Sequence, residues 1–191
     1  IAVQVGTVVK QYSVSSTDGG VTAKLHSEDP FLWKNAEEKK NIIAWHPFTK
    51  IYPTDWTVKA DQSTAANYQA SDLIRADLKD LAFNDRNDPE KSKMIFHHKT
   101  EKVVVNLSAD DGVALDANTS VKLNNLFGLD KGSTITPYKA TVNKHTYLAL
   151  LKEQTLIAKS SFIQVTTGDG TFLYKLPNAK TFKAGNAYTY N

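Results

Sequence analysis

The sequence has no cysteine and no long hydrophobic run. Without cysteine, the chain forms no disulfide, binds no metal through a thiolate and has no cysteine nucleophile. No apolar run approaches the roughly 20 residues that a membrane-spanning helix needs. No series of basic, apolar and small residues at the start marks a signal peptide. The compartment stays open on these grounds, because exported bacterial proteins lack cysteine as readily as cytosolic ones.

The motifs of common enzyme families are missing too: the sequence has no Gly-Xaa-Ser-Xaa-Gly elbow, phosphate loop, dinucleotide fingerprint, His-Glu-Xaa-Xaa-His or calcium loop. His97 and His98 are adjacent, so on a strand they point to opposite faces and do not chelate one metal together. Asp55, Asp61 and Asp72 are candidates for a glycosidase carboxylate pair, but 20 acidic residues make chance pairs expected. We predict no catalytic, cofactor-binding or metal site.

The composition that is present describes a chain able to bury a core. Of its 191 residues, 41% are hydrophobic and 10% aromatic, enough for one large or two small domains. The net charge is only +3, and basic and acidic residues are mixed along the chain instead of forming a basic arm. We therefore expect no nucleic-acid partner.

Alternation of apolar and polar residues recurs along the chain and predicts β-strands. One hairpin is expected between residues 12 and 25, with turn residues at 17–20, and a second over 161–176, around Gly168 and Gly170. The β-branched run at 102–107 predicts a buried central strand. Further short strands are expected at 42–45, 56–60, 121–123, 134–142 and 187–190. The predicted class is all-β and sandwich-like.

Two segments interrupt this pattern. Ile74, Leu78 and Leu81 recur at helical spacing after a possible N-cap at Ser71, which predicts one or two helical turns. Residues 84–92 are polar and contain a proline, which is typical of an exposed loop. This loop divides the chain into two predicted domains, 1–92 and 93–191.

The polar stretch from residue 59 to 77 fits either a hydrolase site or a hydrogen-bonded connection. Ser and Asn side chains bond to backbone in loops far more often than they attack carbonyl groups. We interpret the stretch as a connection in which Gln62, Ser63, Asn67 and Ser71 satisfy backbone groups, while neighbouring apolar side chains pin it to a sandwich.

The three tryptophans, Trp33, Trp45 and Trp56, have two possible uses. Exposed in one plane, they would form a platform that stacks on sugar rings. Buried, each ring contributes about 150–250 Å² of apolar area to a core. Core packing is the preferred interpretation, and a carbohydrate-binding surface module is the alternative.

Nine stretches of the sequence resemble, in content and in order, the fimbrillin-like family of Bacteroides-type bacteria. They span nearly the whole chain. They read DPFLWKN at 29–35, AWHPF at 44–48, WTVKADQS at 56–63, YQASDLI at 68–74, IFHHKTEKVVV at 95–105, ALLKEQ at 149–154, FIQV at 162–165, GTFLY at 170–174 and AGNAYTY at 184–190.

The resemblance implies two transthyretin-like (Greek-key) β-sandwich domains and a structural role without catalysis. It implies an exported fimbrial or adhesin subunit, attached to the outer membrane through a lipidated leader that we expect upstream of Ile1. The implied partners are other fimbrial subunits, and a host surface protein or glycan. Subunits of this kind assemble when one chain donates a strand to the next. The candidate assembly strand comprises Ala187, Tyr188, Thr189 and Tyr190.

Two positions depart from the family pattern. The family often has a proline before the glutamine that corresponds to Gln154, where this chain has Glu153. It usually has a small residue where this chain has Glu101. We expect these departures to affect strand details and not the family assignment.

Overall fold

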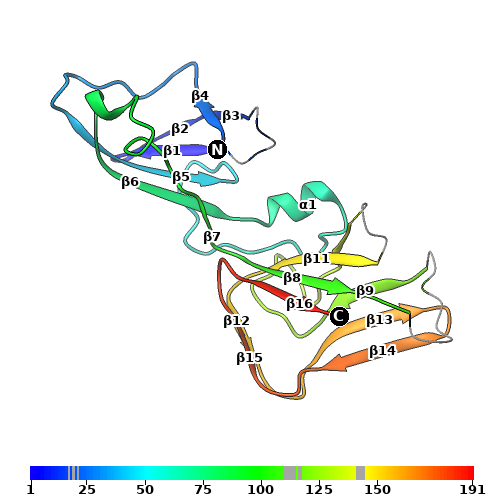
Figure 1. Cartoon of the computed structure of the whole chain (residues 1–191). Coiled ribbons are helices and arrows are strands. Elements are labelled where there is room, and N and C mark those ends of the chain that lie inside the picture. The colour runs from blue at the N-terminus through cyan, green and yellow to red at the C-terminus, as the bar shows by residue number, and fades with distance from the viewer. Residues whose placement is uncertain (17, 19, 21, 110–114, 116–117, 141–144) are drawn as a thin grey trace. The chain divides into compact units, whose positions relative to one another are not determined.

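A computed structural model describes the chain apart from residues 17, 19, 21, 110–114, 116–117 and 141–144 (Figure 1). It divides into two compact units. The first comprises Ile1–Thr54 and Leu73–His97, and the second Asp55–Asp72 and His98–Asn191. Strands dominate both units, so the all-β prediction is confirmed. The transthyretin-like arrangement stays a prediction.

The first unit contains a five-stranded sheet and a separate two-stranded hairpin. In the sheet the strands lie in the order β2-β1-β5-β6-β7, and β3 pairs with β4 in the hairpin. Their bounds are β1 Ala2–Val5, β2 Val8–Gln11, β3 Ser13–Ser15, β4 Lys24–His26, β5 Lys39–His46, β6 Ile74–Ala82 and β7 His97–His98, and a 3-10 turn, η1, spans Phe83–Asp85.

The core of the first unit is small. Val3, Ile42, Ala44 and Leu81 are buried together, and partly buried aromatic and aliphatic side chains from the strands and the connections pack around them. Alternation places these residues on one face of β1, β5 and β6. Loop side chains therefore cover much of this face.

The second unit is a β-sandwich. Its longer sheets have the strand orders β10-β11-β8-β16 and β14-β13-β9, and β12 pairs with β15. The bounds are α1 Ala65–Ala70, β8 Glu101–Asn106, β9 Ser120–Leu123, β10 Tyr138–Lys139, β11 Thr146–Leu151, β12 Gln154–Leu156, β13 Ser161–Thr167, β14 Gly170–Lys175, β15 Lys180–Phe182 and β16 Ala187–Tyr190.

Side chains from both longer sheets form the core of the second unit. Val103 and Leu151 come from one sheet, and Leu123 and Phe162 from the other; all four are fully or almost fully buried. Their strands are held in antiparallel register along β11–β8 and β13–β9. Two apolar faces thus meet over a shared interior.

The polar segment 55–72 belongs to the second unit and closes one side of its sandwich. Val58 is fully buried and makes an isolated bridge with Leu129. Gln62 is also fully buried: its amide donates to the Leu150 carbonyl at 2.8 Å, and its carbonyl oxygen accepts from the Leu150 N–H at 2.8 Å. The Ser71 hydroxyl accepts from the Lys59 N–H. The stretch is a hydrogen-bonded connection, as predicted.

Most of the predicted strands are present. They include the paired strands of both hairpins, the central strand at β8, and β5, β9 and β16. Residues 17 and 19 of the turn predicted at 17–20 lie outside the described residues. The prediction for 56–60 is wrong, because that segment makes only a bridge at Val58. The prediction for 134–142 holds in part: β10 covers two residues, bridges occur at Ile135 and Thr136, and 141–142 lie outside the described residues.

The predicted helix after Ser71 is wrong. Ile74, Leu78 and Leu81 lie on β6, where the pairing with β5 shifts register between Lys40 and Ile42. Such a bulge displaces the alternation and gives apolar residues an apparent helical spacing. The helix lies earlier, as α1, with Thr64 as its N-cap.

The compact units differ from the predicted domain ranges 1–92 and 93–191. Residues 55–72 are grouped with the second unit because their bridges and hydrogen bonds join its strands. Residues 93–97 are grouped with the first unit. The division into independently folding domains stays a prediction.

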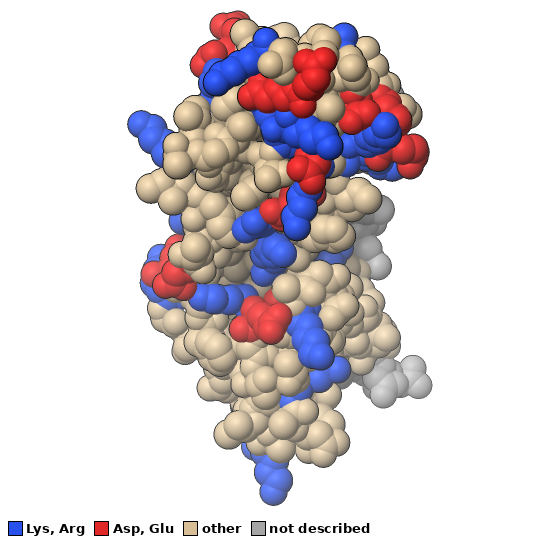
Figure 2. Space-filling view, turned by 90° about the vertical axis from the view of Figure 1, so that its left-hand side faces the viewer, with Lys and Arg blue, Asp and Glu red and all other residues tan. Residues whose placement is uncertain are grey.

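The surface carries charges of both signs. Basic and acidic side chains are intermixed over much of the face that Figure 2 shows, in keeping with the small net charge. Among the described residues, no helix is long and apolar enough to cross a membrane.

Candidate functional site

The candidate assembly strand, β16, forms an edge of its sheet. It runs parallel to β8, with Ala187 opposite Lys102 and Tyr190 opposite Val105 (Figure 1). β8 is the single strand with which β16 pairs in the described part of the chain. Its outer edge therefore presents backbone groups that are free to pair with another extended segment.

The β16 strand is anchored through its two tyrosines. The Tyr188 ring lies 4.9 Å from Phe182, and the Tyr190 ring lies 5.5 Å from Phe162, both edge to face. The Tyr188 hydroxyl accepts from the Lys183 N–H at 2.8 Å. Alternation sends both tyrosines inward, while Ala187 and Thr189 are exposed.

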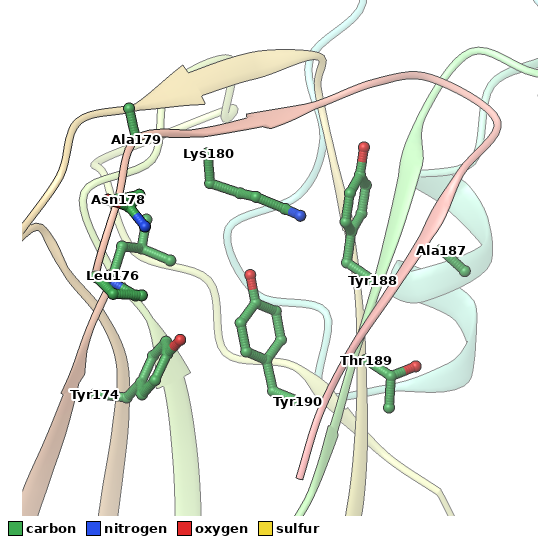
Figure 3. Close-up of a pocket in the computed structure, with 10 residues that line it drawn as sticks. Tyr174, Leu176, Asn178, Ala179, Lys180, Ala187, Tyr188, Thr189 and Tyr190 are labelled. Carbon is green, nitrogen blue, oxygen red and sulfur yellow. The ribbon is translucent and has the colours of Figure 1, made fainter.

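A groove of about 450 Å³ runs beside β16, and we call it the β16 groove. All four residues of β16 line it on one side. The opposite side is formed by the end of β14 and the connection to β15, including Tyr174, Leu176, Asn178 and Lys180. Figure 3 shows the Tyr190 ring between Tyr174 and Tyr188, with Lys180 reaching toward Tyr188.

The strand β14, next to this groove, has apolar side chains that are about half exposed. Its Tyr174 lies in one register row with Ile163 and Leu123, and its Phe172 lies in a row with Val165 and Val121. Within these rows, exposure rises from 0% at Leu123 to 42% at Tyr174, and from 2% at Val121 to 50% at Phe172. The opposing sheet, which ends at β16, thus leaves β14 open.

The electrostatics of the groove are simple. Lys180 is the charged residue in its lining, and its ammonium group lies 4.9 Å from the Tyr188 ring. Burial, with Tyr174 and Tyr188 adding to it, raises the pKa of Tyr190 to about 12. The Tyr190 phenol therefore stays neutral at physiological pH, and the groove offers hydrogen-bonding groups and aromatic faces without a reactive pair.

One of the three tryptophans is fully buried, and the other two are partly buried. Trp45 is fully buried, and its indole N–H donates to the Thr49 hydroxyl at 2.8 Å. Trp33 and Trp56 are partly buried and donate to the carbonyls of Leu81 and Ser71. Trp45 has no exposed face for a sugar ring, so these contacts support the core interpretation.

The carboxylates considered for hydrolysis each have a local partner. Asp55 accepts from the Lys152 ammonium at 2.7 Å, and Asp61 accepts from the Ser63 hydroxyl at 2.6 Å. Asp72 accepts from Thr100 and lies 2.9 Å from His98 Nδ1.

The two adjacent histidines are both exposed. Among the described residues, no group of three or more His, Cys, Asp or Glu side chains is placed to hold a metal ion.

Sequence reasoning did not identify Tyr174, Asn178 or Lys180 as part of the site. Their distance in sequence from β16 gives no indication that they lie beside it. The signal for Tyr174 was its place in the second hairpin, where three successive large apolar residues, 172–174, are exposed on an edge strand.

Comparisons with known proteins agree with the fold. The family model described as "Fimbrillin-like" matches residues 4–191. No curated protein matches the chain.

Solved structures are similar despite low sequence identity. A proposed cell adhesion protein from Bacteroides uniformis has a TM-score of 0.68 and 16% identity, over 98% of this chain and 84% of that one. A second, from Bacteroides ovatus, has a TM-score of 0.63 and 17% identity, over 88% and 68% of the two chains. A fimbrial protein from Bacteroides ovatus has a TM-score of 0.56 and 16% identity, over 99% and 42%. Because the family model covers nearly every residue, the chain belongs to the fimbrillin-like family.

Proposed function

We propose that this chain is a fimbrial subunit at the cell surface, that it assembles by strand donation, and that it carries out no catalysis. The family assignment supports the fimbrial role. The observation that carries the assembly mechanism is the position of β16, which is paired on one side only and lies beside an open groove. We propose that β16 of one chain takes the place of β16 beside β8 of the next.

Such an exchange would replace every contact that a four-residue strand gives up. β16 leaves behind one parallel ladder with β8 and the packing of Tyr188 and Tyr190 on Phe182 and Phe162. The same ladder and the same ring contacts form again when β16 of another chain enters the vacated position. The exchange therefore conserves the contacts and costs mainly the entropy of association.

The β16 groove gives this exchange a second consequence. Whichever chain supplies β16, its outer edge remains unpaired and Phe172 and Tyr174 remain uncovered. An extended segment lying in the groove would pair with this edge and bury both rings. We propose that an extended segment of a neighbouring subunit binds in the groove and strengthens the contact between the two subunits.

A mixed cross-linking experiment tests the exchange. The chain has no cysteine, so one preparation carries only Lys102→Cys and the other only Ala187→Cys. These positions are opposite each other on β8 and β16, and both are exposed. If β16 passes between chains, mixing under mild oxidation links one chain of each variant in a disulfide, visible as a dimer on a non-reducing gel.

The matched control pairs Lys102→Cys with Lys175→Cys. Lys175 is an equally exposed lysine on β14 that does not pair with β8. Equal cross-linking in both mixtures would mean that random collision produces the product. Absence of the Lys102–Ala187 product would contradict strand donation through β16.

Further features of the family remain part of this proposal. We propose transthyretin-like domains, export with a lipidated leader, attachment to the outer membrane, and contact with a host surface protein or glycan. Mass spectrometry of the protein isolated from its native membrane would test the lipid anchor directly.

A further inference from the structure

Glu101 is the least expected buried side chain in the second unit. It is fully buried, and neither carboxyl oxygen has a hydrogen-bond partner in the structure. On β8, burial alternates so that Glu101 shares the inward face with Val103 and Val105. An ionised carboxylate without a partner in such a place is very costly.

A second acidic residue, Glu153, acts on Glu101 from the connection between β11 and β12. Burial, and then the negative charge of Glu153, raises the pKa of Glu101 to about 8. No neighbouring basic residue in the described part of the chain neutralises the negative charge of the two glutamates. Lys102 is exposed on the opposite face of β8, and the Lys152 ammonium donates to Asp55. Lys183, in the turn before β16, is exposed.

The two glutamates lie where β16 is tied to the rest of the unit. The Gly185 N–H donates to the Thr100 carbonyl and the Lys102 N–H donates to the Asn186 carbonyl, both at 2.9 Å. These bonds join the turn at 184–186 to the residues on either side of Glu101. The Ala184 N–H donates to the Glu153 carboxylate at 3.2 Å. Release of this turn would therefore open the place where Glu101 is buried.

We propose that Glu101 and Glu153 form a pH-dependent lock on β16. With a proton on Glu101, the turn at 184–186 stays bonded to β8 and β16 is held. Loss of that proton leaves two negatively charged carboxylates next to the turn. Release of the turn admits water, which solvates both carboxylates and weakens their repulsion. Low pH thus favours the closed chain, and mildly alkaline pH favours a chain whose β16 is free to leave. The link to assembly rests on the proposed strand donation.

The direction of the effect follows from proton linkage. A released turn exposes Glu101 to water, where its carboxyl ionises near its ordinary pKa of 4.5. Between that pH and about 8, the closed form holds a proton that the open form has lost. Opening therefore becomes more favourable by up to about tenfold per pH unit in this window, and becomes constant above it.

Hydrogen exchange in the uncross-linked monomer tests the lock without requiring assembly. The reporters are the Lys102 and Gly185 amides, whose bonds to Asn186 and Thr100 break when the turn opens. Exchange at pH 5.5, 6.5 and 7.5, corrected for intrinsic rates, should rise several-fold per unit in the wild type. In Glu101→Gln, which keeps the shape but has no ionisable proton, it should be independent of pH.

Two further variants keep the test decisive if Glu101→Gln does not fold. Glu153→Gln alters an exposed residue and removes the second charge, so the rise should level off at a lower pH. Glu90→Gln is the matched control, an exposed glutamate outside the second unit, and should behave as wild type.

Three results would overturn the lock. The first is a corrected exchange rate at the Lys102 and Gly185 amides that does not change with pH in the wild type, or that changes in the same way in Glu101→Gln. The second is equal exchange at Lys102 and at the Leu123 amide of β9, which donates to the Ile135 carbonyl, because the unit would then open as a whole. The third is protection by calcium chloride in the wild type alone at pH 7.5, because the pair would then hold a cation. None of these results bears on strand donation, which the cysteine mixture tests separately.

Discussion

The two sides of the second unit's sandwich are finished in different ways. On the side of β9, the segment 55–72 continues the sheet with isolated bridges and covers the interior with Val58 and Gln62. On the side of β14, no described segment continues either longer sheet, and Phe172 and Tyr174 are half exposed. We call these the closed side and the open side.

The difference shows that an irregular segment can close a sandwich without being a strand. The closed side needs only a few bridges because Gln62 satisfies both backbone groups of Leu150 and ties the segment to β11. The open side has apolar rings and a free strand edge, which soluble proteins usually protect. The second unit thus has its more exposed side where β16 lies.

The largest expected effect comes from a core substitution on the closed side. Leu123→Ala should lower the free energy of unfolding by about 2–5 kcal/mol, because Leu123 is fully buried and its removal leaves a cavity. Urea denaturation measures this value. Phe172→Ala removes a larger side chain from the open side and should cost less than about 1 kcal/mol. Equal losses in the two variants would show that both sides are covered in solution.

The second largest loss of stability is expected from Gln62, in the polar segment 55–72 that covers the closed side. Gln62→Ala should destabilise the protein by about 2–3 kcal/mol, because the buried Leu150 N–H and carbonyl lose their partner. Thermal unfolding compares it with Gln164→Ala, a partly buried glutamine on β13. A loss for Gln62→Ala no larger than for this control would contradict a closing role for the segment.

A pH series tests how the buried Glu101 carboxyl of the second unit affects the free energy of unfolding. The pKa of Glu101 is raised, so between pH 4.5 and about 8 the folded protein keeps a proton that the unfolded chain loses. The free energy of unfolding should therefore fall as pH rises, by up to about 1.4 kcal/mol per unit, with no further loss above pH 8. Chemical denaturation should show this slope, and Glu101→Gln should remove it.

The smallest effect on stability is expected on the open side. Phe172→Ser should change the free energy of unfolding by no more than about 1 kcal/mol, since the ring is half exposed. It should nevertheless reduce self-association in sedimentation velocity, because it removes apolar surface next to the β16 groove. Leu173→Ser is the matched control, because Leu173 is equally exposed but lies on the opposite face of β14. If the Leu173 variant loses association as strongly, the groove is not the contact.

Local pattern predicted the fold well where strands are regular. The hairpin of β13 and β14 followed from alternation and two glycines, and β8 followed from its β-branched run. β6 was mistaken for a helix because a bulge within it, where Leu78 and Leu81 pair with Ile42 and Lys40, disturbs the period of two. No local pattern indicates that residues 55–72 join the second unit, since their partners lie about 70 to 90 residues further along the chain.

The candidate site was predicted only in part. The residues of β16 were identified from the resemblance to the family, and the strand is present as predicted. The opposite wall of the groove, at Tyr174 and Lys180, depends on how β14 and β15 return past β16. Glu101 and Glu153 were noted as departures from the family pattern, but their nearness became visible only in the structure.

The sequence alone determined that this protein is built from strands and belongs to a structural family without a recognisable catalytic motif. Side-chain periodicity and turn residues are local properties, and they act over a few neighbouring positions. Tertiary structure decided which edges are closed, which stay open and which carboxyl group is removed from water. Those outcomes depend on pairing and burial between residues far apart in the chain, and local periodicity carries no information about them.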